Sequence, residues 1–165
     1  MRLGNYDVET IRTSDRVILR DGIEVEIQPL PPDWDDLVAR ELPPPRPKQI
    51  DVERDRKGKI LHDDTGRPIP KYDVENEGYQ RALARHQKRQ ALHMLLTGLA
   101  PGEMLFDAER GEDLGAYLDA VLEELKAFGF SMGDLIRVVK AIGNLSGLTD
   151  EDLEVAERSF FGATI

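Results

Sequence analysis

The sequence predicts a single α+β domain that is mostly helical, and three observations support this prediction. Apolar residues alternate with polar ones between about Arg16 and Gln28, which is the period of β-strands. From Asn76 onward they recur every three or four residues, which is the period of helices. Residues 43–75, between these regions, contain six prolines and few apolar residues, a composition typical of an extended arm.

Composition excludes several classes of protein. The 165 residues suffice for one domain with one hydrophobic core. The absence of cysteine excludes disulfides, thiol nucleophiles and cysteine-ligated metals. The net charge of −10 opposes general binding to phosphate backbones or anionic membranes. Because residues 1–11 lack an apolar run and no stretch approaches the ~20 apolar residues of a membrane span, we expect a soluble, intracellular protein.

Residues 1–42 are expected to form a β-hairpin followed by a short helix. The hairpin spans about Arg16 to Gln28, and Asp21-Gly22 is expected as its two-residue turn. Its alternating apolar positions are Val17, Leu19, Ile23, Val25 and Ile27. Asp33 is placed to cap a helix from Trp34 to Leu42. The predicted apolar face of this helix consists of Trp34, Leu37 and Val38, with Leu42 as a further candidate.

Residues 43–75 are expected to form a proline-rich, charged arm. Lys57-Gly58 and Thr65-Gly66 are turn signals within it. Gln49–Arg54 and Lys59–Asp63 are candidates for a loose hairpin.

Residues 76–165 are expected to form a helical bundle. The apolar period and the stop signals predict helices at about 76–98, 113–128 and 132–143, and a last helix at about 150–161. Ser131 and Asp134 have the spacing of a capping box at the start of the third of these helices. Gly143-Asn144 is expected to end that helix.

Tests for catalytic and metal-binding motifs fail on spacing. Neither a Walker phosphate loop nor a Gly-x-Gly-x-x-Gly turn occurs. A segment that begins at Asp51 imitates the first ligands of a calcium loop, but arginine and histidine occupy its required glycine and glutamate positions. His86 and His93 lie two helical turns apart, whereas a helical zinc site prefers ligands at i and i+4. We therefore predict no catalysis, no metal and no cofactor.

The stretch 79–97 is the one clearly basic part of the chain. It contains four cations and no acid, and the cations are Arg81, Arg85, Lys88 and Arg89. The helix that follows carries Asp119, Glu123 and Glu124. We expect these opposite charges to pair within the chain or with a protein partner, in preference to nucleic acid, because the net charge opposes the latter.

The order of elements resembles the tail assembly chaperones and related small tail proteins of long-tailed bacteriophages. The strings that carry the resemblance are Val17–Leu42, Lys57-Gly58-Lys59-Ile60, Asp64-Thr65-Gly66-Arg67-Pro68-Ile69-Pro70, Tyr79-Gln80-Arg81-Ala82-Leu83 and Leu148–Phe160. The resemblance implies a non-enzymatic protein of the host cytoplasm that binds the tape-measure protein, the tail-tube subunits or both. Many members of that family also exist as a frameshift-extended form.

Two alternatives to a chaperone remain open at this point. One is a structural adaptor that stays in the virion, in the tail or at the head–tail junction. The other is a regulator that binds nucleic acid through the basic helix 79–97. Homo-oligomerisation is open in all three cases.

The predicted partner-binding surface lies where the basic helix ends. Apolar residues are dense there and Pro101-Gly102 interrupts the helix, so part of the group must fold back or face a partner. The predicted surface comprises Leu92, Leu95, Leu96, Leu99, Met104, Leu105 and Phe106, bordered by Arg85, Lys88 and Arg89. The alternative, that the seven apolar residues belong to the core, is equally open, because large apolar side chains are usually inside.

Overall fold

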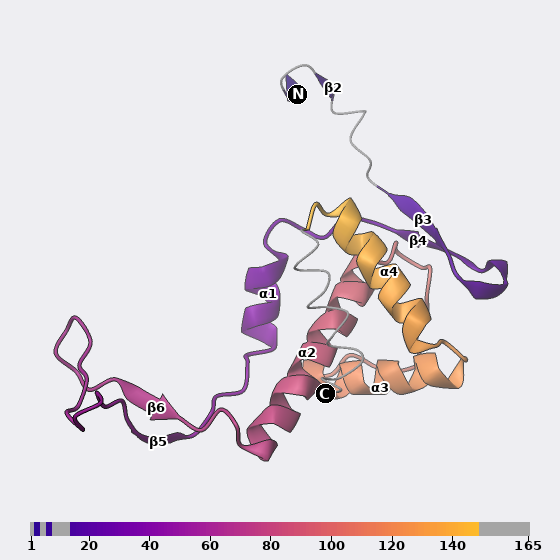
Figure 1. Ribbon diagram of the computed structural model, residues 1–165. Coiled ribbons are helices and arrows are strands. Elements are labelled where there is room, and N and C mark those ends of the chain that lie inside the picture. The colour runs from indigo at the N-terminus through magenta and orange to yellow at the C-terminus, as the bar shows by residue number, and fades with distance from the viewer. Residues whose placement is uncertain (1, 4–5, 8–13, 149–165) are drawn as a thin grey trace. The chain divides into compact units, whose positions relative to one another are not determined.

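The computed structural model describes residues 2–3, 6–7 and 14–148 (Figure 1). This part of the chain is a mixed α+β fold with four α-helices and three two-stranded antiparallel sheets. It divides into two compact units. The first unit combines Met1–Pro43 with His86–Ile165, and the second unit is Pro44–Arg85. The last helix predicted by the sequence, at about 150–161, lies outside the described residues.

The N-terminal β-structure of the first unit begins with a pair of short strands. Strand β1 (Arg2–Leu3) pairs antiparallel with β2 (Tyr6–Asp7). The predicted hairpin follows as β3 (Asp15–Ile18) and β4 (Glu24–Ile27), which are antiparallel.

The turn of this hairpin differs from the prediction. It is a three-residue turn, the 3-10 segment Arg20–Gly22, and the amide of Leu19 donates to the carbonyl of Ile23 at 2.8 Å. Gly22 adopts a φ of 74°, which only glycine adopts without strain. This turn places Leu19 opposite Ile23 and Val17 opposite Val25, and of these four residues only Ile23 is exposed.

Helix α1 (Trp34–Glu41) forms where the sequence predicts it, and it packs through one face. Val38 and Leu42 are buried, and Trp34 is half-buried against the core. Asp33 occupies the N-cap position, but its side chain makes no capping hydrogen bond. The indole Nε1 of Trp34 instead donates to Nδ1 of His93 at 3.1 Å and so ties the start of α1 to α2.

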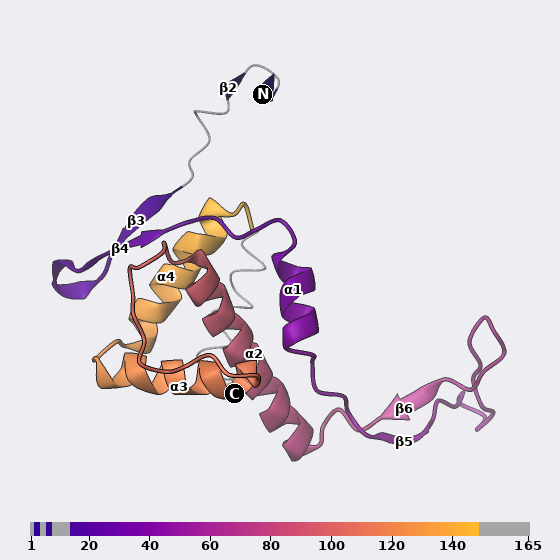
Figure 2. The same ribbon diagram turned by 180° about the vertical axis from the view of Figure 1, so that it is seen from behind.

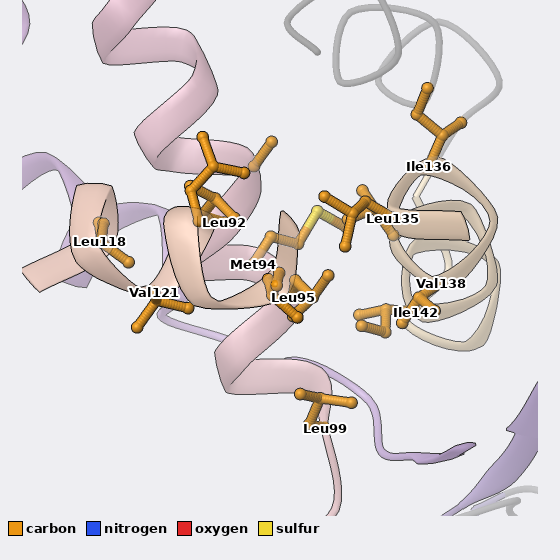
Figure 3. Close-up of a cluster of buried hydrophobic side chains, with 14 of the residues drawn as sticks. Leu92, Met94, Leu95, Leu99, Leu118, Val121, Leu135, Ile136, Val138 and Ile142 are labelled. Carbon is orange, nitrogen blue, oxygen red and sulfur yellow. The ribbon is translucent and has the colours of Figure 1, made fainter. Parts of the chain in front are cut away.

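The three long helices form the core of the first unit. Their bounds are α2 (Glu77–Gly98), α3 (Leu114–Ala127) and α4 (Met132–Leu145), each within two residues of the prediction. Figure 3 shows their buried side chains meeting in one cluster. The cluster includes Leu92, Met94, Leu95, Leu99, Leu118, Val121, Leu135, Val138 and Ile142. Figure 2, the view from behind, shows that the segment 99–113 connects the end of α2 to the start of α3 and passes along α3 on the way.

The ends of α4 confirm one prediction and correct another. Ser131 and Asp134 form the predicted capping box, in which each side chain accepts the other residue's backbone amide, at 3.2 and 2.8 Å. The helix does not end at Gly143, which is buried inside it. It ends at Leu145, because Gly147 adopts a φ of 75° and the amide of Leu148 returns to the carbonyl of Gly143 at 2.9 Å.

The second unit contains paired strands and the first part of α2, and it has no core, since none of its side chains is fully buried. Strand β5 (Gln49–Val52) pairs antiparallel with β6 (Pro70–Tyr72), as Figure 1 shows. The prediction that residues 59–63 pair with Gln49–Val52 is therefore wrong. The bridge between Arg54 and Ile60 and the hydrogen bond from the amide of Leu61 to the carbonyl of Glu53 still join those two segments as expected.

A closed triangle of backbone hydrogen bonds orders the second unit in place of a core. The amide of Glu53 donates to the carbonyl of Ile69, Ile69 donates to Leu61, and Leu61 donates to Glu53, at 2.8, 3.0 and 2.9 Å. The three residues are spaced eight apart in the sequence. This spacing makes the segment an internal repeat, which sequence analysis missed because the repeat preserves turn chemistry and not an apolar pattern.

Each repeat closes with the same loop. In the first loop the side chain of Asp55 accepts the amides of Lys57 and Lys59, at 2.8 and 2.9 Å. In the second loop the side chain of Asp63 accepts the amides of Thr65 and Arg67, both at 2.9 Å. The amide of Arg67 is the main cause that lowers the pKa of Asp63, with the hydroxyl of Thr65 next.

Replacing Asp63 by alanine is expected to open only its own loop. The amides of Thr65 and Arg67 lose their side-chain acceptor, so their hydrogen exchange should accelerate, as NMR would measure. The amides of Lys57 and Lys59 in the same variant are the internal control, and Asp55→Ala should give the mirror-image result. If both loops open in either single variant, the two loops are not independent.

Candidate functional site

The structure separates the predicted partner surface into a buried part and an accessible part. Leu92, Leu95 and Leu99 are buried in the core. For these three residues the prediction of a partner surface is wrong. Leu92 and Leu95 pack in the cluster with α3 and α4, and Leu99, directly after α2, is bridged to Ile27 of β4. Leu96, Met104 and Phe106 are half-buried against the core. Leu105 is 88% exposed.

Of the predicted basic border, Arg89 is engaged within the chain. The guanidinium of Arg89 donates to both carboxylate oxygens of Asp119, at 3.0 and 2.7 Å, and these hydrogen bonds raise the pKa of Arg89. Gly115 makes room for this pair, since a Cβ there would lie 2.5 Å from the Arg89 guanidinium. Arg81 pairs with Glu77 on its own helix at 2.8 Å. Two of the four cations of the basic helix therefore have an acidic partner within the chain, although the Arg81–Glu77 pair is exposed on both sides and so is weak.

The two remaining cations and the other predicted acids follow a different pattern. Arg85 is exposed and Lys88 is half-buried. Glu123 pairs with Lys126 one turn later, at 2.7 Å. Glu124 accepts two loop amides instead of facing the basic helix. The expected pairing of opposite charges between neighbouring helices therefore holds at Asp119 and fails at Glu123 and Glu124.

Leu96 lines a separate cavity, but Met104, Leu105 and Phe106 converge on one of about 320 Å³ in the first unit. We call it the acid-rimmed groove. Its apolar lining consists of Ile23, Val25, Met104, Leu105, Phe106, Leu125, Phe128 and Phe130, and its acidic lining consists of Glu24, Glu103 and Glu124. Three of the eight apolar residues are exposed, Ile23 by 53%, Leu105 by 88% and Phe128 by 86%. Exposure of several large apolar side chains around one hollow is typical of a binding surface.

Two of the groove's apolar residues are positioned by chain reversals. Ile23 follows the three-residue turn of the β3–β4 hairpin. Phe128 caps the end of α3, where Gly129 adopts a φ of 88° and the amide of Phe130 returns to the carbonyl of Leu125 at 2.9 Å. This helix ending leaves Phe128 outside the core while Leu125 stays inside.

The loop that carries Leu105 is held from both sides by the rim carboxylates. Glu124 accepts the amides of Asp107 and Ala108, at 2.9 and 2.6 Å. Glu103 accepts the amide of Glu26 in β4 at 3.1 Å. These hydrogen bonds hold the loop in place, so Leu105 is exposed from an ordered loop.

Sequence analysis found three of the groove's residues, Met104, Leu105 and Phe106, and missed the others. The sequence predicts Ile23 as an inward residue of a strand and gives Phe128 only as the end of a helix. The signal that points to Phe128 and Phe130 is a pair of aromatics around a glycine directly after a helix. A glycine at this position commonly adopts positive φ and ends the helix, so the residues before and after it point in different directions.

A second cavity of about 300 Å³ lies beside His93 and is lined in part by Leu96, Arg110 and Tyr117. Nδ1 of His93 accepts the hydrogen bond from Trp34 and lies 3.4 Å from the hydroxyl of Thr97. Its Nε2 lies 3.8 Å from Glu41, which also pairs with Arg110 at 2.8 Å. Burial is the main cause that lowers the pKa of His93.

This arrangement predicts that acid loosens α1 from α2. Protonated His93 cannot accept from Trp34, and its folded-state pKa lies below the usual 6.5. The unfolded chain therefore binds the proton first, and stability is lost as pH falls below about 6.5, by at most ~1.4 kcal/mol per pH unit for one proton. Urea unfolding followed by Trp34 fluorescence between pH 7.5 and 5.5 would measure this loss.

His93→Gln is expected to flatten the pH dependence, because the glutamine oxygen still accepts from Trp34 but takes up no proton. His62→Gln, in the second unit, is the matched control and should keep the wild-type slope. An equally steep slope in His93→Gln would assign the effect to other groups, with His86 first among them because burial also lowers its pKa.

The described residues contain no cluster of three side chains suited to hold a metal ion. None of the helices in the described part combines the length and apolar character that spanning a bilayer requires. Comparison with protein-family models, with curated proteins and with solved structures found no match to this chain.

Proposed function

We propose that the protein is a non-enzymatic binding protein that shields an apolar segment of a partner. The observation that supports this proposal is the acid-rimmed groove, where Ile23, Leu105 and Phe128 are exposed around one hollow. Burying these side chains against a partner would release ~25 cal/mol for each Å² of apolar surface removed from water. The strongly acidic remainder of the chain would keep such a complex dispersed.

Within this class, we propose a chaperone-like role in the assembly of bacteriophage tails, with the tape-measure protein or tail-tube subunits as partners. The resemblance in element order suggests these partners, and the groove supplies a surface of the required kind. The rival role of a nucleic-acid regulator needs several free cations on the basic helix, where Arg89 is held by Asp119, and the net charge of −10 also opposes it. A virion adaptor, the other rival role, would use the same groove and would differ from a chaperone only in remaining in the finished particle.

Co-expression with the tape-measure and tail-tube proteins of the same genome tests the proposal. The wild-type chain should co-purify with one of them, and Leu105→Asp should reduce the captured amount at least tenfold without changing the melting temperature. Leu61→Asp is the control, because Leu61 is 40% exposed, belongs to the second unit and does not line the groove.

The outcomes separate the candidate roles. A chaperone should be missing from purified virions, whereas an adaptor should be present in them. Capture that is equally strong in wild type and Leu105→Asp would contradict the groove as the binding site. No capture of either tail protein by the wild type would contradict the tail-assembly role.

A further inference from the structure

We infer that the occupant of the acid-rimmed groove is an amphipathic helix whose apolar face is flanked by lysine or arginine. This inference rests on the proposed partner-binding function and specifies the chemistry of the partner. Three features of the first unit carry it: the blocked edge of β4, the shape and lining of the groove, and the sign of the charge at its rim.

The edge of β4 is already occupied, which disfavours a partner that adds a β-strand. The amide of Glu26 donates to Glu103, and its carbonyl accepts from the amide of Ala100 at 3.0 Å. The amide of Gln28 donates to the carbonyl of Gly98 at 2.8 Å. Strand addition depends on a run of free backbone groups along an edge. The groove therefore offers side-chain contacts, which suit a helix.

The lining of the groove suits the regularly spaced anchors of a helix. Apolar side chains reach it from three separate places, at Ile23 after the hairpin turn, Leu105 in the loop and Phe128 at the end of α3. A volume of about 320 Å³ lies near the lower limit of pockets that bind whole small molecules, ~300 Å³. Helices that dock in grooves insert anchors at positions i, i+3 or i+4 and i+7, which a compact hollow can receive.

The charge at the rim selects the flanks of the helix. The groove is lined by three acidic residues, Glu24, Glu103 and Glu124, and its lining contains no lysine, arginine or histidine. Glu24 forms a pair with Arg16, but both side chains are exposed, so this pair is weak. Arg20, which lines an adjoining cavity, is paired with Asp134 at 3.1 Å.

The wider surroundings have the same sign. The first unit contains 12 basic and 24 acidic side chains, a net charge of −12, whereas the second unit is at +2 with 10 basic and 8 acidic side chains. A cationic flank would therefore be attracted over a distance and favoured in contact, and an anionic flank would be repelled.

Two synthetic peptides test the inference with the full-length protein. Each has about 14 residues, ~21 Å as a helix, with leucine at helical spacing and either lysine or glutamate at all other positions. Fluorescence anisotropy of the labelled peptides should show that the lysine peptide binds at least tenfold more tightly than the glutamate peptide. The difference should shrink at high salt, because salt screens exposed charges.

Variants separate groove binding from attraction to an acidic surface. The double variant Leu105→Ser with Phe128→Ser should weaken lysine-peptide binding at least tenfold, and Ile50→Ser, at an exposed apolar residue of the second unit, should not. The double variant Glu24→Gln with Glu103→Gln should weaken lysine-peptide binding about threefold or more, because it removes two rim charges. It should keep the fold, because the glutamine oxygen at position 103 still accepts the backbone amide of Glu26.

Each contrary outcome overturns a definite statement. Equal binding of both peptides, lost in the serine variant, would refute the basic flank and leave the groove as the binding site. Lysine-peptide binding that survives in the serine variant would show non-specific attraction and refute the groove itself. Self-association of the wild type that the serine variant abolishes, seen by light scattering, would identify a second copy as the occupant instead.

Discussion

Replacing Leu95 by alanine is expected to lower the free energy of unfolding by about 2–5 kcal/mol, the range for buried leucines. Leu95 has no exposed surface and lies at the centre of the cluster between α2, α3 and α4 (Figure 3). Alanine would leave a cavity that the neighbouring helices can close only in part. Denaturation followed by the fluorescence of Trp34, the only tryptophan of the chain, measures the change in the first unit.

Leu105→Ala is the matched control for this prediction. The chemistry of the substitution is identical, but Leu105 is 88% exposed, so its loss should change stability by less than about 0.5 kcal/mol. The pair divides a set of leucines that the sequence alone treats alike. Similar losses at both positions would contradict the division into core and groove.

Replacing Gly98 by alanine is expected to destabilise the first unit by about 1–3 kcal/mol. A Cβ at this position would lie 2.4 Å from Cγ2 of Ile142, and 2.6 and 2.7 Å from two further atoms of the same side chain. Ile142 is completely buried and cannot swing away. Intrinsic helix preference favours alanine over glycine, so it acts against the expected loss and cannot produce it.

A double-mutant cycle with Ile142→Ala tests this explanation. The methyl group added at position 98 should fill part of the cavity left at 142, so the double variant should be less destabilised than the two single losses together, by about 0.5–3 kcal/mol. Gly111→Ala is the control, because a Cβ at Gly111 would meet no atom within 4 Å. Additive losses in the cycle would refute direct contact between positions 98 and 142.

The local features of the fold could be predicted from the sequence because they depend on neighbours along the chain. The apolar period places α2, α3 and α4 within two residues, since one helical face must be buried whatever buries it. The capping box of Ser131 and Asp134 is complete within four residues. The hairpin of Val17 and Val25 forms for the same reason, although its turn has three residues and not two.

The second unit shows where local reasoning fails although the signals are local. Its turns at Gly58 and Gly66 were visible, and both glycines adopt positive φ. Local reasoning pairs β5 with the nearest segment, residues 59–63. In the structure two successive loops separate β5 from its true partner, β6. Strand partners follow from the hydrogen bonds that all three segments can close together, and the triangle of Glu53, Leu61 and Ile69 has no apolar pattern to reveal it.

The candidate site divides in the same way. The sequence by itself determined that apolar residues are concentrated around the end of α2 and that the chain is acidic. Only the tertiary structure decided that Leu95 belongs to the core and Leu105 to the groove, and that Ile23 and Phe128 join Leu105. The physical reason is that a side chain's period along one helix defines a face, whereas its burial depends on which other elements cover that face.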